Sequence, residues 1–405
     1  MATNSEMNRN RRGPSLGPAD WNATKERWRA FWRRDLCDRP ILNITVPKID
    51  KDIKSLSGVI STADRPVKFS PEDAERIDKI RDSLLPDRPA YTPCFNTNPG
   101  KEFMDIDQMI RRNLYNWSGV DFMGDAFAVL NHRWSVADAM IFGCEPGFNE
   151  FAPWCDPVDL PGDPPALPHV YENGEHRKWM LDSVKKACIE SQGRFFTRTD
   201  WGNYTGDVLS SIRGSNQLME DIGLRKEWVR KAADIVTRGL LDLYRDVCET
   251  INQYSSIEGM INYLKCWSDS SVISLDCDVC CMISPSDFTD LFFNGLVEAV
   301  ETFDCSIFHL DGPGAIKHLD KVMSIPELNA IQWVPGAGHT DIYQWVDLLQ
   351  HIQKDGKKAL LIQIAPSEAD DVIKNLSPKG LAVSMWGETH DEVLQALEKF
   401  EKWRV

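Results

Sequence analysis

The sequence has no segment rich in basic residues and no long apolar run. Its 405 residues carry 61 acidic and 46 basic side chains, a formal net charge of −15. Lys and Arg gather only in short pairs such as Arg11–Arg12 and Arg33–Arg34. A nucleic-acid-binding surface needs a basic footprint, so we expect no nucleic-acid partner. No stretch approaches the roughly 18 apolar residues of a membrane helix, and the N-terminal segment has no signal-peptide core, so we expect a cytoplasmic protein without a membrane span.

Two further motifs are missing from the sequence. No predicted strand is followed by a glycine-rich nucleotide fingerprint, which removes the main support for a dinucleotide-binding fold. The eleven cysteines include the pair Cys277-x-x-Cys280, but there is no second C-x-x-C and no histidine at zinc-finger spacing. Because several cysteines lie in apolar segments, we expect reduced thiols in the core.

Short apolar runs alternate with amphipathic stretches in the C-terminal third. The predicted strands are 272–277, 306–310, 330–334, 359–364 and 381–385, and the predicted helices are 285–303, 314–323, 341–354, 367–376 and 390–403. The runs recur every ~22–32 residues, the size of a βα unit in a parallel sheet. We therefore predict an α/β fold, specifically a (β/α)8 TIM-type barrel.

The N-terminal part of the chain has a weaker pattern. We predict a disordered tail over 1–20 and a single barrel domain over 21–405, with a helix at 23–36 as an N-terminal extension and a first strand at 41–46. The segment 85–175 is rich in Pro, Gly, Asn and aromatic residues and predicts long loops over the barrel mouth. A strand at 193–199 and helices at 207–221 and 225–254 follow.

Candidate catalytic residues come from the ends of the predicted strands, where barrel enzymes carry their chemistry. His309 and Asp311 are alternate residues of one strand and share a face, so they form either an acid/base pair or two metal ligands. The alternative is a packed histidine and an Asp311 that caps the helix starting near Gly314. Asp278 is either a carboxylate at the barrel mouth or the acceptor of nearby loop amides. Glu388 follows the last strand and completes the catalytic candidates.

The substrate-binding candidates also lie at strand ends. They are Gln332, Trp333, Gln363, Trp386 and Asp200, and Asp276, Asp207, His339 and His390 occupy similar positions. The tryptophans either form the wall of a substrate site or close the core.

Several motifs of the C-terminal half resemble one known group of enzymes. They are the step from Asp278 to Ile283-Ser284-Pro285, the turn His309-x-x-Gly312, the element Ile212-Arg213-Gly214, and the ending VSMWGETHDEV. From about Arg194 onward, the chain resembles the uroporphyrinogen decarboxylase superfamily, and it is closer to the cobalamin-dependent methyltransferase branch than to true porphyrin decarboxylases. The resemblance implies a TIM barrel and a site that includes His309.

The chain also departs from this superfamily. Porphyrin decarboxylases have an arginine-rich segment after the first strand, whereas Thr45-Val46-Pro47-Lys48 contains no arginine. The methyltransferase branch holds zinc with an H-x-C motif and a later cysteine. Here Asp311 replaces the first cysteine, and no cysteine follows Cys305. His309 and Asp311 therefore predict either a harder site for a divalent metal such as zinc, or a metal-free acid/base site.

The leading functional hypothesis is methyl transfer between a small O- or N-methylated compound and a corrinoid carried by a partner protein. The first alternative is a lyase that decarboxylates or cleaves a small acid without a cofactor. The second is a ligand-binding barrel without catalytic activity. The sequence leaves open the identity of the substrate and whether the chain forms a homo-oligomer.

Overall fold

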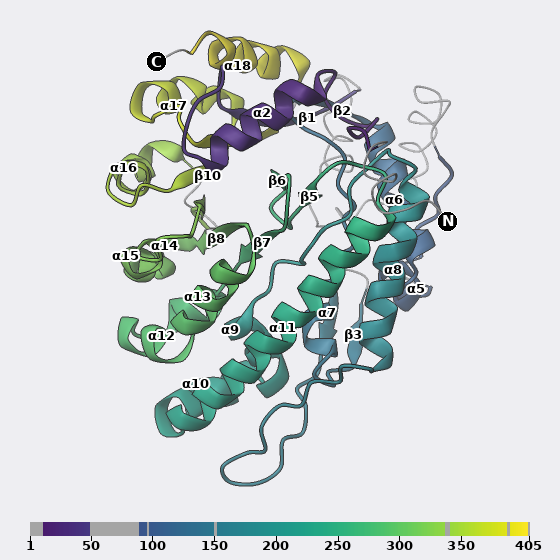
Figure 1. The fold of residues 1–405 in the computed structure, drawn as a ribbon, viewed down its shortest axis with the longest axis vertical. Coiled ribbons are helices and arrows are strands. Elements are labelled where there is room, and N and C mark those ends of the chain that lie inside the picture. The colour runs from purple at the N-terminus through teal and green to yellow at the C-terminus, as the bar shows by residue number, and fades with distance from the viewer. Residues whose placement is uncertain are drawn as a thin grey trace.

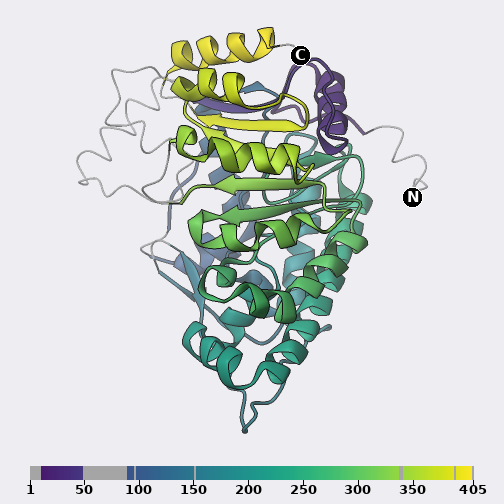
Figure 2. The ribbon, with the colours of Figure 1, turned by 90° about the vertical axis from the view of Figure 1, so that its left-hand side faces the viewer.

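The centre of the fold is a parallel sheet with one antiparallel edge strand. The computed structural model describes residues 11–48, 89–94, 97–149, 152–336, 341–386 and 389–403. Within these residues a seven-stranded sheet has the order β2-β1-β11-β10-β9-β8-β7, shown in Figures 1 and 2. The strands are β1 (Ile41–Pro47), β2 (Val120–Gly124), β7 (Val272–Leu275), β8 (Cys305–Asp311), β9 (Ala330–Val334), β10 (Ala359–Ile364) and β11 (Leu381–Trp386). In this seven-stranded sheet, the β1–β2 pair is antiparallel and the other described pairs are parallel.

The five strands predicted in the C-terminal third are confirmed to within two residues. Helices follow each strand, and these helices lie together on one side of the sheet in Figure 1. They are α12 (Pro285–Leu291), α13 (Phe293–Thr302), α14 (Gly312–Ala315), α15 (Leu319–Met323), α16 (Val346–Lys354), α17 (Ala369–Asn375) and α18 (His390–Lys402). The predicted helices 285–303 and 314–323 are each divided into shorter ones, and the predicted helix 341–354 begins with a 3-10 turn, η4 (Ile342–Trp345). Ser284 and Thr389 cap α12 and α18 through side-chain oxygens, as their positions before acidic first turns indicate.

The described sheet does not close by strand pairing alone. Between its two edges lie the segments 126–130 and 195–199, which are joined by a single parallel bridge, Val129↔Phe196. Asp125 N donates to Leu42 O at 2.7 Å, and Thr199 Oγ1 donates to Val272 O at 2.7 Å. These contacts link the two segments to β1 on one side and to β7 on the other. The predicted strand 193–199 is thus present only as this irregular segment.

The inner face of the sheet changes from apolar to polar along the strands. One buried cluster joins the inner-face residues near the strand starts to Trp28 and Phe31 of α2 (Trp21–Trp32). It includes Ile41, Ile307, Ala330, Leu361 and Ala382.

 On β10 the members of this cluster are Ala359 and Leu361. Two residues further along each strand, the same face carries polar side chains: Asn43, His309, Gln332, Gln363 and Ser384. The opposite face, with residues such as Leu310 and Trp333, packs in the main hydrophobic core.

The segment 85–175, predicted to be loops, contains regular structure. It includes α5 (Pro99–Met104), α6 (Ile106–Ser118), α7 (Ala137–Met140), the hairpin strands β3 (Pro146–Phe148) and β4 (Pro153–Cys155), and strand β2. Part of this region is held by a buried polar group, because Glu102 accepts hydrogen bonds from Tyr91, Gln108 and Arg112. The prediction of loops was wrong here, since such a network leaves no apolar periodicity in the sequence.

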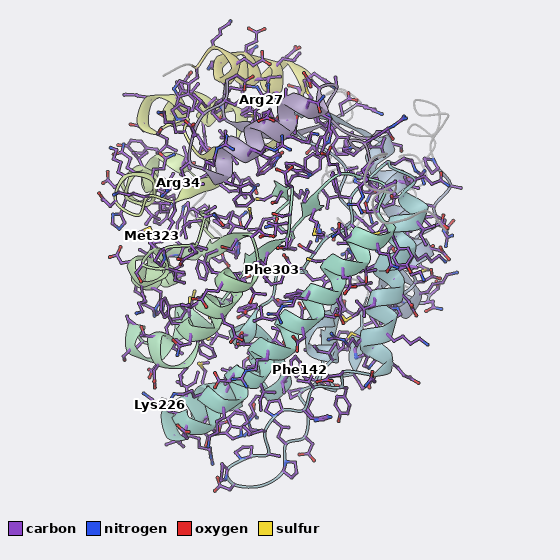
Figure 3. The ribbon with its side chains drawn as sticks, viewed as in Figure 1. Arg27, Arg34, Phe142, Lys226, Phe303 and Met323 are labelled. Carbon is purple, nitrogen blue, oxygen red and sulfur yellow. The ribbon has the colours of Figure 1, made fainter. Side chains whose placement is uncertain are left out.

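Residues 175–254 form the helices α8 (Glu175–Ser191), α9 (Thr205–Arg213), α10 (Ser215–Leu224) and α11 (Lys226–Tyr254), and the short strands β5 (Met260–Ile261) and β6 (Trp267–Ser268) follow. The predicted helix 225–254 is confirmed as α11, whereas the predicted helix 207–221 is divided at Gly214 into α9 and α10. Phe142, labelled in Figure 3, is buried against α11 at Gly239, where a Cβ atom would lie 2.8 Å from the ring.

The second half of the predicted disordered tail has defined contacts. Arg12 forms a parallel bridge with Ile257, and Ser15 N donates to Gly193 O at 2.8 Å. Residues 1–10 lie outside the described residues. In the described part of the chain, no helix has the length and apolar composition needed to cross a bilayer.

Candidate active site

Three potential metal ligands meet at the carboxyl ends of β7 and β8. Asp276 directly follows β7, Asp278 begins the short 3-10 helix η2 (Asp278–Met282), and His309 lies in β8. One donor atom from each residue lies within 4.8 Å of the others. The structure therefore brings together two of the predicted catalytic residues, His309 and Asp278, with Asp276, which the sequence placed at a similar strand end. Asp311, predicted to bind a metal with His309, is not one of the three. We call these three residues the Asp276 cluster.

His309 is oriented by a residue of the neighbouring strand. His309 and Gln332 are register partners on β8 and β9, and His309 Nδ1 lies 2.5 Å from Gln332 Oε1. An amide oxygen can only accept a hydrogen bond, so Nδ1 is the donor and Nε2 keeps its lone pair for a metal or a proton. Gln332, predicted to bind substrate, is thus engaged with His309.

Asp207, at the start of α9, holds the loop that carries Asp278. Its two carboxylate oxygens accept hydrogen bonds from Asp278 N at 3.1 Å and Val279 N at 3.0 Å. The loop amides are therefore satisfied by Asp207, and the side chain of Asp278 is exposed. Asp207, and not Asp278, therefore accepts the hydrogen bonds of these two amides.

Asp311 lies at the end of β8, next to the Asp276 cluster. Its side chain makes no capping hydrogen bond to α14, so the capping alternative does not describe it. Partial burial, together with the nearby charge of Asp278, raises the pKa of Asp311 above its ordinary value. Asp311 is thus placed to exchange a proton beside the cluster.

The site has a concentration of negative charge. Burial and the proximity of Asp207 and Asp278 raise the pKa of Asp276 well above its ordinary value, and burial and Asp278 raise the pKa of Asp207 to about 7. Within the described residues, none of these carboxylates forms an ion pair with Lys or Arg. The buried oxygen Oδ1 of Asp276 also has no hydrogen-bond partner there. Carboxylate oxygens and one imidazole are suitable ligands for a divalent cation, which would relieve this repulsion.

The predicted substrate-binding residues are distributed over different parts of the fold. Gln363 is exposed on the same sheet face as His309, although its strand neighbours are buried. Trp333 is 1% exposed on the opposite face and packs against Trp345 at a centroid distance of 4.9 Å. Successive side chains of a strand point to opposite faces of the sheet, so Trp333, which follows Gln332, points toward the helices.

Asp200 is buried away from solvent and serves as a connection between elements. Its oxygens accept hydrogen bonds from Tyr263 N at 3.1 Å and Ser274 N at 2.8 Å. Burial raises its pKa to about 6. The Asp200 carboxylate therefore attaches the end of segment 195–199 to β7, and each of its two oxygens already accepts a backbone hydrogen bond.

The remaining candidates lie near the end of β11. Trp386 is its last residue and is the register partner of Thr45. Glu388 and His339 lie outside the described residues. His390 begins α18, and its Nε2 lies 2.9 Å from Asp121 Oδ2 on β2.

Sequence reasoning missed two polar residues of the inner face. Asn43 and Ser384 are register partners on β1 and β11, and Ser384 is also paired with Gln363. The three residues continue the row of His309 and Gln332 across the sheet. The strand alternation could have identified them once the strand order was known, because each follows a buried apolar residue by two positions.

The C-x-x-C motif does not contribute to the Asp276 cluster. Cys277 and Cys280 are 3% and 1% exposed, and their thiols pack in the main core.

The chain has a structural relative among known proteins but no match by sequence. No protein-family model and no curated protein matches it. The fold is similar to that of a solved structure described as a methyltransferase from Methanosarcina mazei, with a TM-score of 0.56 and 13% sequence identity. The similarity covers 93% of this chain and 98% of the other. It shows a shared mixed α/β fold over almost the full length of both proteins.

Proposed function

We propose that this chain is a divalent-metal-dependent methyltransferase. The observation that carries the proposal is the Asp276 cluster, three convergent donors at the carboxyl edge of a parallel sheet. That edge is where α/β enzymes of this architecture place their chemistry. The fold likeness to a protein described as a methyltransferase supports the choice of reaction. We also propose that the segments 126–130 and 195–199 complete a (β/α)8 barrel.

The methyl donor in this proposal is a small O- or N-methylated compound, and the acceptor is a corrinoid carried by a partner protein. Asp278 and Gln363 are exposed at the same edge, which supports access for a large acceptor. Asp311 is replaced by cysteine in the methyltransferases that the sequence resembles, so a substrate other than a thiol is favoured.

Each residue of the site has a separate role in the proposed reaction. Asp276, Asp278 and His309 would hold the metal, leaving an open position for the donor. The metal, when bound, would act as a Lewis acid on the oxygen or nitrogen that loses its methyl group. Asp311, whose pKa is raised, would donate a proton to that atom. Gln332 keeps His309 in the required tautomer.

A methyl-transfer assay tests this function. The purified chain is incubated with free reduced cobalamin and a panel of methylated alcohols, ethers and amines, with and without Zn²⁺ or Mn²⁺. We expect metal-dependent loss of the reduced-cobalamin absorbance, and His309→Ala should lower the rate by at least ~100-fold. The matched control is Asp234→Asn, an exposed position on α11, which should keep full activity.

Two other outcomes would contradict the proposal. Release of CO2 from a small acid in the absence of cobalamin would indicate a lyase. Tight ligand binding without turnover of any donor would indicate a binding protein.

A further inference from the structure

Two cysteines lie at the open end of the β3–β4 hairpin. Cys144 precedes β3, and Cys155 is the last residue of β4. The hairpin register pairs Cys155 with Pro146, two residues after Cys144. Cys144 therefore lies on the segment that enters the hairpin, and Cys155 lies on the strand that leaves it, at the same end.

Both thiols also meet on the same turn of α9. Cys144 Sγ lies 3.9 Å from Ser211 O, and the Cys155 thiol is hydrogen-bonded to Ser211 and to Cys144. Cys144 is buried and Cys155 is only half-buried. An oxidant in solution can thus reach Cys155 first, and Cys144 is next to it.

We propose that Cys144 and Cys155 are a redox-active pair that forms a reversible disulfide. The Cys155 thiolate attacks a low-molecular-weight disulfide, such as oxidised glutathione, and releases one thiolate. Cys144 then loses its proton to solvent and attacks Cys155 Sγ, which releases the second thiolate. Two cysteine thiols are oxidised and one small disulfide is reduced to two thiols, a two-electron exchange.

The electrostatics of the pair agree with these roles. The hydrogen bond from Cys144 lowers the pKa of Cys155, while the same hydrogen bond and burial raise the pKa of Cys144. A partly exposed thiolate with a lowered pKa is the attacking group in thiol–disulfide exchange, and its buried neighbour resolves the mixed disulfide. Cys277 and Cys280 are also hydrogen-bonded to each other, but both thiols are buried in the main core.

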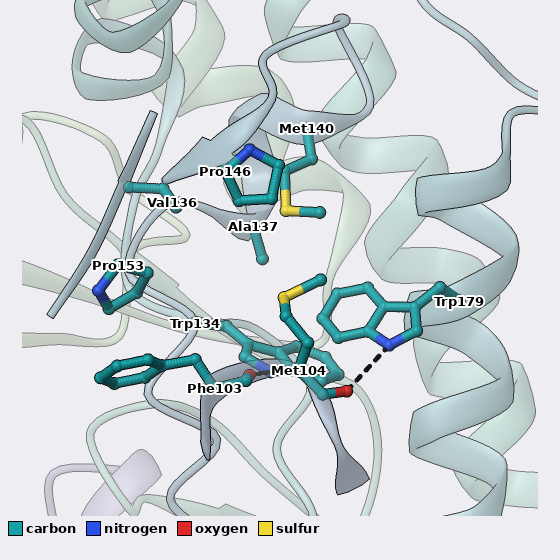
Figure 4. A pocket seen from close by; sticks show the side chains of 9 residues that line it. All are labelled: Phe103, Met104, Trp134, Val136, Ala137, Met140, Pro146, Pro153 and Trp179. Carbon is teal, nitrogen blue, oxygen red and sulfur yellow. Dashed lines mark hydrogen bonds between the residues drawn. The ribbon is translucent and has the colours of Figure 1, made fainter. Parts of the chain in front are cut away.

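The disulfide would fix the hairpin above a small apolar pocket. Pro146 and Pro153, one from each hairpin strand, line this pocket together with Phe103, Met104, Trp134, Val136, Ala137, Met140 and Trp179, as Figure 4 shows. The indole N–H groups of Trp134 and Trp179 donate to Phe103 O and Met104 O, so the walls are apolar. A disulfide between Cys144 and Cys155 would join the two strands at the open end of the hairpin and so limit their movement relative to each other.

Peptide mapping of the full chain tests the proposal. No Lys or Arg lies between Arg133 and Arg177, so trypsin yields one peptide, 134–177, that contains only these two cysteines. The reduced protein is incubated with oxidised glutathione, its free thiols are alkylated, and the digest is analysed by mass spectrometry. We expect this peptide to lose two hydrogens and to carry no alkyl group. In Cys144→Ser, the same treatment should leave glutathione bound to Cys155.

Cys37 is the internal control, because it is exposed and has no cysteine neighbour among its interactions. It should take up glutathione without forming an internal disulfide. The proposal is overturned if peptide 134–177 of the wild type is fully alkylated while Cys37 is modified. A stable mixed disulfide on Cys155 in the wild type would overturn it as well.

Discussion

At the residue scale, the site depends on the tautomer of His309. Gln332 Oε1 accepts a hydrogen bond from His309 Nδ1, with 2.5 Å between the two atoms. We predict that Gln332→Leu removes the preference for the Nδ1–H tautomer and lets the ring adopt the other one. Loss of such an outer partner should weaken metal binding by about 10–100-fold. Long-range ¹H–¹⁵N spectra of the metal-free protein report the tautomer, with His309→Ala used to assign the signal. Gln332→Glu keeps an acceptor and should preserve the Nδ1–H form, whereas an unchanged spectrum in Gln332→Leu would refute this role.

The sequence predicted part of this site. His309 and Asp278 were predicted because each follows an apolar run and carries a side chain suited to acid/base or metal chemistry. The partnership of His309 with Gln332 was not predictable, since it depends on the register between β8 and β9. The structural role of Asp200 was not predictable for a related reason: its two backbone partners come from segments more than sixty residues away.

At the scale of elements, the segment 195–199 is attached to β7 by side chains instead of a strand ladder. We predict that Asp200→Asn destabilises the fold by about 2–3 kcal/mol, because the amide has only one acceptor oxygen for two buried backbone N–H groups. Urea unfolding measures the change, and Asp234→Asn on the surface should stay within about 0.5 kcal/mol of the wild type. Equal stability of the two variants would show that the attachment of this segment does not depend on Asp200.

The regular elements were predicted better than the irregular ones. Strands β8 to β11 are short apolar runs that alternate with amphipathic helices, so composition and periodicity are sufficient to find them. Segment 126–130 has one ladder bridge, and α5 and α6 are organised around the buried carboxylate of Glu102. In both cases long-range polar contacts decide the structure, and these leave no periodic pattern.

At the scale of the whole molecule, a buried acid makes stability depend on pH. Burial raises the pKa of Asp138 to about 7 from 3.8, although Tyr244 donates a hydrogen bond to it at 2.8 Å, and the nearby Asp200 raises it further. Between about pH 4 and 7 the folded state keeps a proton that the unfolded chain has lost. Stability therefore falls as the pH rises through this range, by up to about 4 kcal/mol.

Asp138→Asn should remove the contribution of Asp138 to this dependence and leave those of Asp200, Asp207 and Asp276. We predict that the variant gains stability relative to the wild type when urea unfolding is repeated from pH 5 to pH 8. The Tyr244 hydroxyl can still donate to the new amide oxygen, so the local contact is kept. A difference between the two proteins that stays constant across this range would contradict the assignment.

The most direct test of the account is metal binding to the chelator-treated protein, measured by calorimetry with Mn²⁺ and with Zn²⁺. The three donors of the Asp276 cluster predict one ion per chain. Asp276→Ala and His309→Ala should each weaken binding by at least ~100-fold, since each removes a ligand, while Asp234→Asn should bind as the wild type does. Absence of binding, or binding that is unchanged in both ligand variants, would contradict the central claim.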